Sequence, residues 1–142
     1  MIIMPFAPEH LEQLRDNQTQ GHIGVALRDP AYIQTLVESD GWTAIENGKV
    51  LGSAGLIPVW QGHTHAWALL AADCGPAGML LLTRAILRML KMQAGRIQTV
   101  VEADFVEGQR WMKVLGFTRE TPDVMRKWYP DGSDAILYSR VT

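Results

Sequence analysis

The chain has 142 residues, a net charge of −2 and 47% hydrophobic residues, which is enough apolar material for a single domain over residues 1–142. Basic and acidic residues are interspersed without a basic block, so the charge pattern argues against nucleic acid as a partner. A single cysteine, Cys74, excludes an intrachain disulfide and a cysteine-based zinc site, and we expect no metal.

The N-terminal residues lack the basic and then apolar layout of a signal peptide. No apolar run approaches the length of about 18 residues that would indicate a membrane-spanning helix. We therefore expect a cytoplasmic protein without a membrane partner.

The first third of the chain is predicted to contain one strand and two helices. Ile2–Met4 is a short apolar run that indicates a strand, and Glu9–Arg15 has helical spacing of its leucines. Asn17–Gly24 is polar and contains glycine, which is typical of a loop. Asp29, followed by proline, is a strong helix start and predicts a helix through Val37.

From residue 42 the hydrophobic pattern changes to a period of two, which indicates strands. Trp42–Glu46 and Lys49–Trp60 are separated by Asn47-Gly48, the strongest short signal for a hairpin turn. A second turn at Gly62 leads into His63–Ala71. These segments predict a three-stranded antiparallel meander.

The meander leads into a glycine-bearing turn and a strongly apolar helix, Pro76–Gln93. The first backbone N–H groups of a helix have no partner within it, and the helix dipole adds partial positive charge, so this turn favours an anion such as a phosphate. Gly75 and Gly78 would keep side chains away from the anion. The position of Cys74 beside the start of the helix would favour a lowered pKa of its thiol. The alternative is an ordinary turn closed by small residues.

The last third is predicted to add a strand, a helix and a hairpin. Ile97–Ala103 is the strand and Val106–Leu115 the helix. Val124–Trp128 and Ala135–Val141 are predicted as strands joined by a turn over Tyr129–Ser133. The element order βααβββαβαββ predicts an α/β fold of the α+β type, with a mixed, mostly antiparallel twisted sheet flanked by helices. The fourth and fifth strands should run parallel because a helix connects them.

This order of elements, together with the segment Trp111–Phe117 (WMKVLGF), resembles the GNAT superfamily of acetyl-CoA-dependent N-acetyltransferases. In that family a helix ending in Leu-Gly-Phe follows the fifth strand. The segment Trp67–Leu70 and the Pro-Asp-Gly-Ser-Asp turn further resemble the small GNAT-like proteins of bacteriophages and prophages. The likeness implies acetyl transfer from acetyl-CoA to a small-molecule or protein amine.

The resemblance also implies which residues hold the cofactor. Pantetheine would lie along the fourth strand and pyrophosphate on the following turn. The implied cofactor-binding residues are Leu69, Leu70, Ala71, Cys74, Gly75, Pro76, Ala77, Gly78 and Met79. Three positions depart from the family pattern: Ala72 replaces a Gln or Arg, Phe105 replaces an Asn that contacts the cofactor, and Met112 replaces a proton-donating Tyr.

Catalysis of amine acetylation needs a base and a donor to the thioester carbonyl. His65, on the predicted fourth strand, is the preferred base because its ordinary pKa of about 6.5 suits the task. His63 shares its face of the strand and is the second choice. Glu102 and Asp104, at the end of the fifth strand, are acidic alternatives. A backbone N–H on a bulged fourth strand is the expected carbonyl donor.

The three departures leave two functions open. The chain is either an N-acetyltransferase for an unidentified amine or a catalytically degenerate GNAT-fold phage protein with a virion-associated, assembly or binding role. The second function predicts a homo-oligomer or a phage structural partner, with contacts at Trp128 and Tyr129. It would place the protein in the bacterial host cytoplasm or in the virion.

Overall fold

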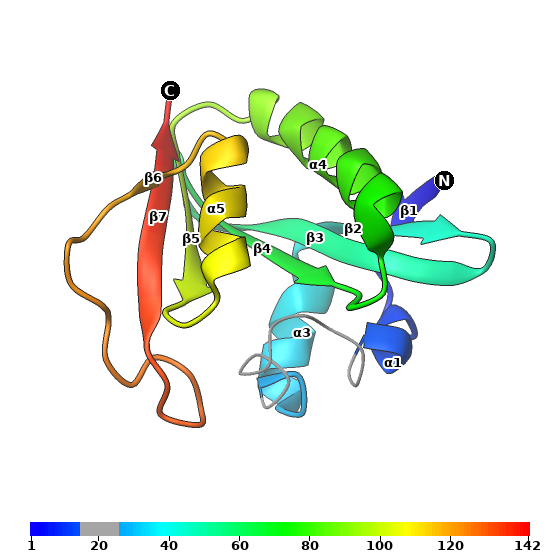
Figure 1. Cartoon of the computed structure of the whole chain (residues 1–142), viewed down its shortest axis with the longest axis horizontal. Coiled ribbons are helices and arrows are strands. Elements are labelled where there is room, and N and C mark those ends of the chain that lie inside the picture. The colour runs from blue at the N-terminus through cyan, green and yellow to red at the C-terminus, as the bar shows by residue number, and fades with distance from the viewer. Residues whose placement is uncertain (15–25) are drawn as a thin grey trace.

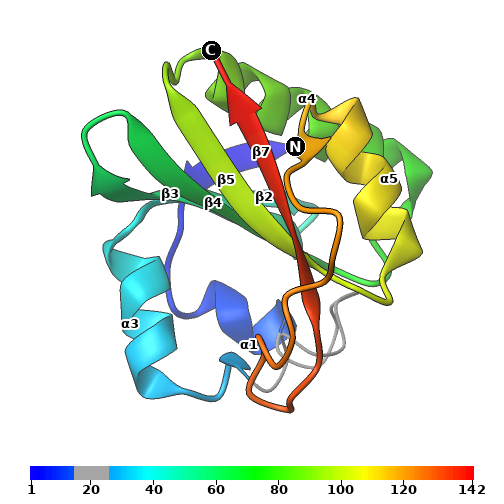
Figure 2. The same ribbon diagram turned by 90° about the vertical axis from the view of Figure 1, so that its left-hand side faces the viewer.

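The computed structural model describes residues 1–14 and 26–142, which form one twisted sheet flanked by helices (Figure 1). In these residues the strand order is β1-β2-β3-β4-β5-β7-β6. The strands are β1 (Ile2–Pro5), β2 (Asp40–Glu46), β3 (Lys49–Trp60), β4 (His63–Leu70), β5 (Arg96–Glu102), β6 (Thr118–Arg119) and β7 (Ala135–Val141). Neighbours run antiparallel except β4 and β5, and Figure 2 shows β5 and β7 side by side. The predicted fold class and the parallel pair are confirmed.

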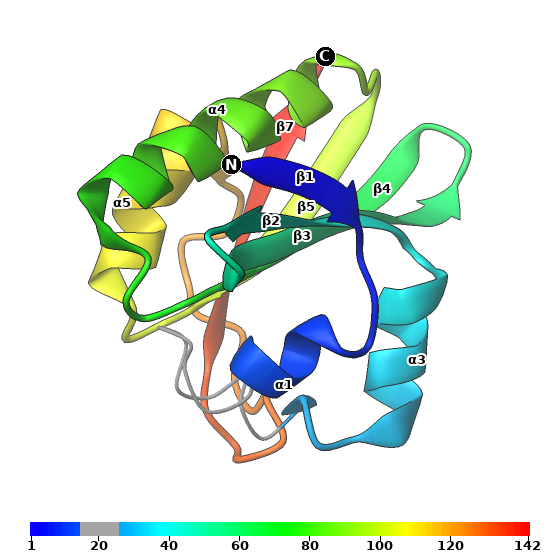
Figure 3. The ribbon, with the colours of Figure 1, turned by 90° about the vertical axis from the view of Figure 1, so that its right-hand side faces the viewer.

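Helices cover both faces of the sheet. The described helices are α1 (His10–Leu14), α3 (Pro30–Glu38), α4 (Gly75–Lys91) and α5 (Val106–Val114). Figure 3 shows α4 and α5 on one face and α1 and α3 on the other. The loop expected at Asn17–Gly24, and Arg15 of the first predicted helix, lie outside the described residues. Within the described ranges no helix has the length and apolar character needed to cross a membrane.

Local chemistry explains most element boundaries. Asn47 and Gly48 have φ of 52° and 76°, the left-handed backbone of a tight hairpin turn. The helix α5 ends where Gly116 adopts φ of 84°. There the N–H of Phe117 donates to the carbonyl of Met112 at 2.9 Å, and the N–H of Gly116 donates to Lys113 at 3.1 Å, the paired bonds of a Schellman motif.

The strand predicted over Val124–Trp128 is wrong. The partner of β7 at this edge is the two-residue β6, and from the predicted segment only Met125 forms a bridge, with Ala135. Lys127 has φ of 55°, a left-handed conformation that breaks an extended strand. The N–H of Trp128 then donates across a turn to the carbonyl of Ser133 at 3.0 Å.

The parallel pairing of β4 and β5 is short. It covers His63 with Arg96, Thr64 with Ile97, and His65 with Gln98. The next link is made by a side chain, because the Thr99 hydroxyl donates to the carbonyl of Ala66 at 2.8 Å.

Beyond this link β4 stays paired with β3 without irregularity as far as Leu70. The only register shift in the β3–β4 pair lies between Pro58 and Trp60 on β3. The bulge expected in the fourth strand is therefore absent from β4.

Candidate active site

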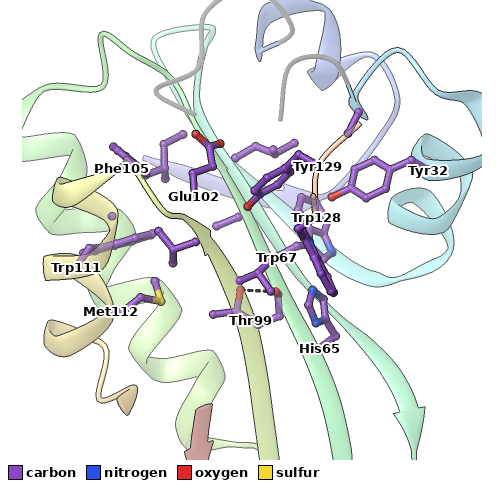
Figure 4. Close-up of a pocket in the computed structure, with 18 of the residues that line it drawn as sticks. Tyr32, His65, Trp67, Thr99, Glu102, Phe105, Trp111, Met112, Trp128 and Tyr129 are labelled. Atoms are coloured by element: carbon purple, nitrogen blue, oxygen red, sulfur yellow. Dashed lines mark hydrogen bonds between the residues drawn. The ribbon is translucent and has the colours of Figure 1, made fainter. Parts of the chain in front are cut away.

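A cavity of about 380 Å³ lies beyond the short pairing of β4 and β5 (Figure 4). Its walls come from both faces of the sheet. Phe105, Trp111 and Met112 line it on the α5 side, whereas Tyr32 and Trp128 line it on the α3 side. The cavity therefore lies between the two strands, with walls from both faces of the sheet.

His65, the base preferred from the sequence, lines this cavity. Burial lowers the pKa of the imidazole below its ordinary value, and the nearby His63 lowers it further. His65 is consequently neutral at pH 7 and able to accept a proton. His63 is outside the residues that line the cavity, and its ring packs against Trp60 with a centroid distance of 5.3 Å.

Glu102 also lines the cavity, with only 4% of its surface exposed. It does not form a pair with His65. His65 is level with Gln98 in the sheet, and Glu102 follows four residues later on β5, about 13 Å along the strand. Asp104 is exposed and lies outside the residues that line the cavity, so of the two predicted acidic alternatives only Glu102 belongs to the cavity wall.

Two of the three departures from the family pattern lie in the cavity wall. Met112 is 7% exposed and belongs to the core under α4 and α5, and Phe105 packs against this core. Neither side chain has a proton to donate.

The hydroxyls of the wall come from residues that the sequence did not indicate for this purpose: Tyr32, Thr99 and Tyr129. Burial raises the pKa of both tyrosines, and Glu102 adds to the effect on Tyr129. Both hydroxyls therefore stay protonated at neutral pH. No spacing signal links them to β4, because Tyr32 lies in a helical pattern and Tyr129 in a predicted turn.

The predicted cofactor residues divide between two places. Leu69 and Leu70 line the cavity, and Ala71 is buried just beyond them. The turn and helix start from Cys74 to Met79 contribute no side chain to the cavity wall; they lie at the N-terminal end of α4.

The start of α4 is open at its tip. Gly75 has φ of 77°, and a Cβ built on it would meet nothing within 4 Å. Pro76 and Ala77 are exposed, and the first turn of α4 carries no acidic residue. Lys49 forms an ion pair with the neighbouring Asp73 at 2.5 Å, which offsets the nearest negative charge. The exposed N–H groups and open space fit a pyrophosphate.

Gly78 has a different reason to be small. It is buried, and a Cβ there would lie 2.7 Å from the Cys74 sulfur, so Gly78 makes room for packing rather than for an anion. Burial raises the pKa of Cys74, contrary to the lowering expected at a helix start. Met79 is half-buried and packs against the core.

No protein-family model matches the sequence, and no curated protein matches it. Solved structures do resemble the fold. Ard1 from Thermoplasma volcanium is 19% identical with a TM-score of 0.76, over 99% of this chain and 97% of that chain. A GNAT family acetyltransferase from Elizabethkingia anophelis, with acetyl-CoA bound, is 17% identical with a TM-score of 0.70, and the match covers 99% of this chain and 97% of that chain.

A third similar structure is the ribosomal-protein-S18-alanine N-acetyltransferase from Escherichia coli. It is 18% identical with a TM-score of 0.66, over 97% of this chain and 91% of that chain. These likenesses concern the whole length of the chain and the order of its strands and helices. The protein has the fold of the GNAT acetyltransferases.

Proposed function

We propose that this protein is an acetyl-CoA-dependent N-acetyltransferase. The observation that carries the proposal is the cavity between β4 and β5, whose wall combines the neutral imidazole of His65 with residues from both faces of the sheet. The fold shared with known acetyltransferases supports the same chemistry.

The cofactor would be held by two parts of the chain. Leu69 and Leu70 offer an apolar wall for the pantetheine arm. The N–H groups of Gly75 and Ala77 would donate to the pyrophosphate at the start of α4, where the helix dipole favours negative charge. The cofactor supplies a thioester, whose C–S bond breaks as the new N–C bond forms.

The protein residues manage protons around this step. An amine reaches the site as an ammonium ion, and His65 would accept a proton so that the nitrogen lone pair becomes available. The nitrogen loses its second proton as the amide forms, and this proton replaces, through water, the one that the leaving CoA thiolate gains. Because Met112 cannot supply that proton, water or the protonated hydroxyl of Tyr32 or Tyr129 would do so.

A second candidate is a binding protein that kept this fold and lost catalysis, such as a phage assembly or virion protein. The observation that favours it is Met112, whose thioether is built into the core where the family pattern has a proton donor. Trp128, 51% exposed, would then serve as a contact for a second copy or a structural partner.

The decisive experiment compares Ala77→Glu with Ala77→Gln by calorimetry of CoA binding. Ala77 is exposed in the first turn of α4, where a carboxylate stabilises a helix but repels pyrophosphate. We expect Ala77→Glu to bind CoA at least about tenfold more weakly than Ala77→Gln, with no loss of thermal stability. Equal affinity of the two variants would contradict the cofactor site.

Activity is then measured as thiol release with a broad panel of amines. Binding of CoA with turnover of any amine supports the enzyme. Absence of both CoA binding and turnover, together with self-association in light scattering, would support the binding protein instead.

A further inference from the structure

The α3 side of the cavity carries several aromatic rings. Figure 4 shows Tyr32 and Trp128 across the cavity from Phe105 and Trp111. Trp128 is half-exposed although its ring forms part of the wall, so it retains surface on which a ligand can pack. Aromatic rings offer large contact area to an apolar ligand and an attractive face to a cation.

Two of the aromatic residues of the wall, Trp128 and Tyr129, belong to a hydrogen-bonded turn. The N–H groups of Trp128 and Tyr129 donate to the carbonyl of Ser133, at 3.0 and 3.1 Å, and the N–H of Gly132 donates back to Tyr129 at 2.8 Å. The Asp131 carboxylate accepts from the N–H of Ser133 at 3.0 Å and closes the turn. The backbone that carries Trp128 and Tyr129 is therefore held by hydrogen bonds within its own turn.

Among the residues that the structure describes, the carboxylates Asp29 and Glu102 are the charged groups of the cavity wall. The described lining contains no lysine or arginine. Asp29 also caps α3, accepting from the N–H of Ala31 at 3.0 Å. The pKa of Tyr129 is raised by burial first and then by the charges of Glu102, Asp104 and Asp131, which shows that negative charge acts on this region. Such surroundings attract an ammonium ion and repel a carboxylate.

We propose that the acceptor is a small primary amine with an aromatic or apolar body and no carboxylate. This inference rests on the proposed acetyltransferase function. Glu102 attracts the ammonium group into the cavity by its charge, the body of the amine packs against Trp128, and the nitrogen becomes reactive once it lies next to His65 and the imidazole accepts a proton. A cavity of about 380 Å³ is at the small end of the range for ligand pockets, and it must also admit the thioester end of the cofactor.

Matched probes test each part of this chemistry. 2-Phenylethylamine has the proposed features, phenylalanine adds a carboxylate to the same body, 2-phenylethanol removes the charge, and n-butylamine removes the ring. A hexapeptide with an N-terminal alanine represents a protein acceptor. Binding of each probe is measured by calorimetry with CoA present, and acetylation by thiol release with acetyl-CoA.

We expect 2-phenylethylamine to bind and react best, with kcat/KM at least about tenfold above that of every other probe. Trp128→Ala should weaken its binding about tenfold, the size expected for loss of ring packing against the body of the amine. Glu102→Gln should weaken the binding of 2-phenylethylamine but leave the binding of 2-phenylethanol unchanged. Trp60→Ala is the matched control, because Trp60 is 69% exposed and outside the cavity lining.

The outcomes separate this inference from the proposed function. Failure to bind CoA overturns the acetyltransferase and this inference with it. Binding of CoA with preference for the peptide or for phenylalanine, or with no binding of 2-phenylethylamine, overturns only the substrate class. A folded Trp128→Ala variant that binds 2-phenylethylamine as tightly as the parent also overturns the substrate class.

Discussion

Burial of the His65 imidazole decides the pH range in which it accepts a proton. Its pKa lies below the ordinary value of about 6.5, first because the ring is desolvated and second because His63 is near. Between the folded pKa and about 6.5 the unfolded chain binds more protons than the folded one. As the pH falls through this window, His65 therefore makes the protein less stable. Above the window the imidazole of His65 is neutral and can accept a proton.

In the proposed reaction, kcat/KM should rise with pH through a pKa below about 6.5 and reach a plateau by pH 7. His65→Gln should lower kcat/KM by about 100-fold or more and remove this acid limb. His63→Gln should instead shift the limb to higher pH, because it removes the charge that lowers the pKa of His65. An acid limb that persists unchanged in His65→Gln would show that another group is the base.

At the scale of elements, a buried polar network holds α1 against the sheet. The Thr43 hydroxyl on β2 lies 2.7 Å from Nδ1 of His10 and 2.8 Å from the Ser53 hydroxyl on β3. The N–H of Ala7 also donates to Nδ1 of His10 at 3.1 Å. Thr43 is fully buried, so loss of its hydroxyl would leave polar partners without compensation from water.

Thr43→Val keeps the shape of the side chain and removes this hydroxyl. We expect it to lower the free energy of unfolding by about 1–3 kcal/mol, measured by urea denaturation. The exposed Thr35→Val, on α3, is the control and should change stability by less than about 1 kcal/mol. Equal effects of both substitutions would mean that the network contributes little.

The elements also show what the sequence can and cannot predict. The Asn47-Gly48 hairpin, the Asp29 cap and the end of α5 at Gly116 depend on neighbouring residues, and local pattern predicted them. The segment Val124–Trp128 has strand composition, but only Met125 pairs with β7, and the N–H of Trp128 bonds across a turn to Ser133 instead. The cavity wall joins residues from distant parts of the chain, such as Tyr32, His65 and Tyr129, which no local pattern connects.

At the scale of the whole molecule, the sheet has two parts joined by a narrow link. The strands β1 to β4 form one part and β5 to β7 the other. Three residue pairs of β4 and β5, together with the hydrogen bond from Thr99 to Ala66, join the two parts. A ligand between β4 and β5 would touch both parts. Its binding should therefore stabilise the fold as a unit.

Acetyl-CoA at 100 times its Kd should raise the free energy of unfolding by about 2.7 kcal/mol. For a chain of 142 residues this corresponds to a rise in Tm of about 10 °C, measured by differential scanning calorimetry. Ala77→Glu should show a smaller rise at the same concentration, because its affinity is lower. A Tm of the parent that does not change with the ligand concentration would contradict binding to the folded state.

The contribution of both faces of the sheet to the cavity wall has a consequence for the order of events in the proposed reaction. A donor from one face and an acceptor from the other do not block each other, so both can be present when the acetyl group moves. The chain's single cysteine, Cys74, is outside the cavity lining, so no cysteine thiol is in place to carry the acetyl group as a covalent intermediate. Steady-state rates should accordingly give intersecting double-reciprocal lines rather than the parallel lines of a substituted-enzyme mechanism.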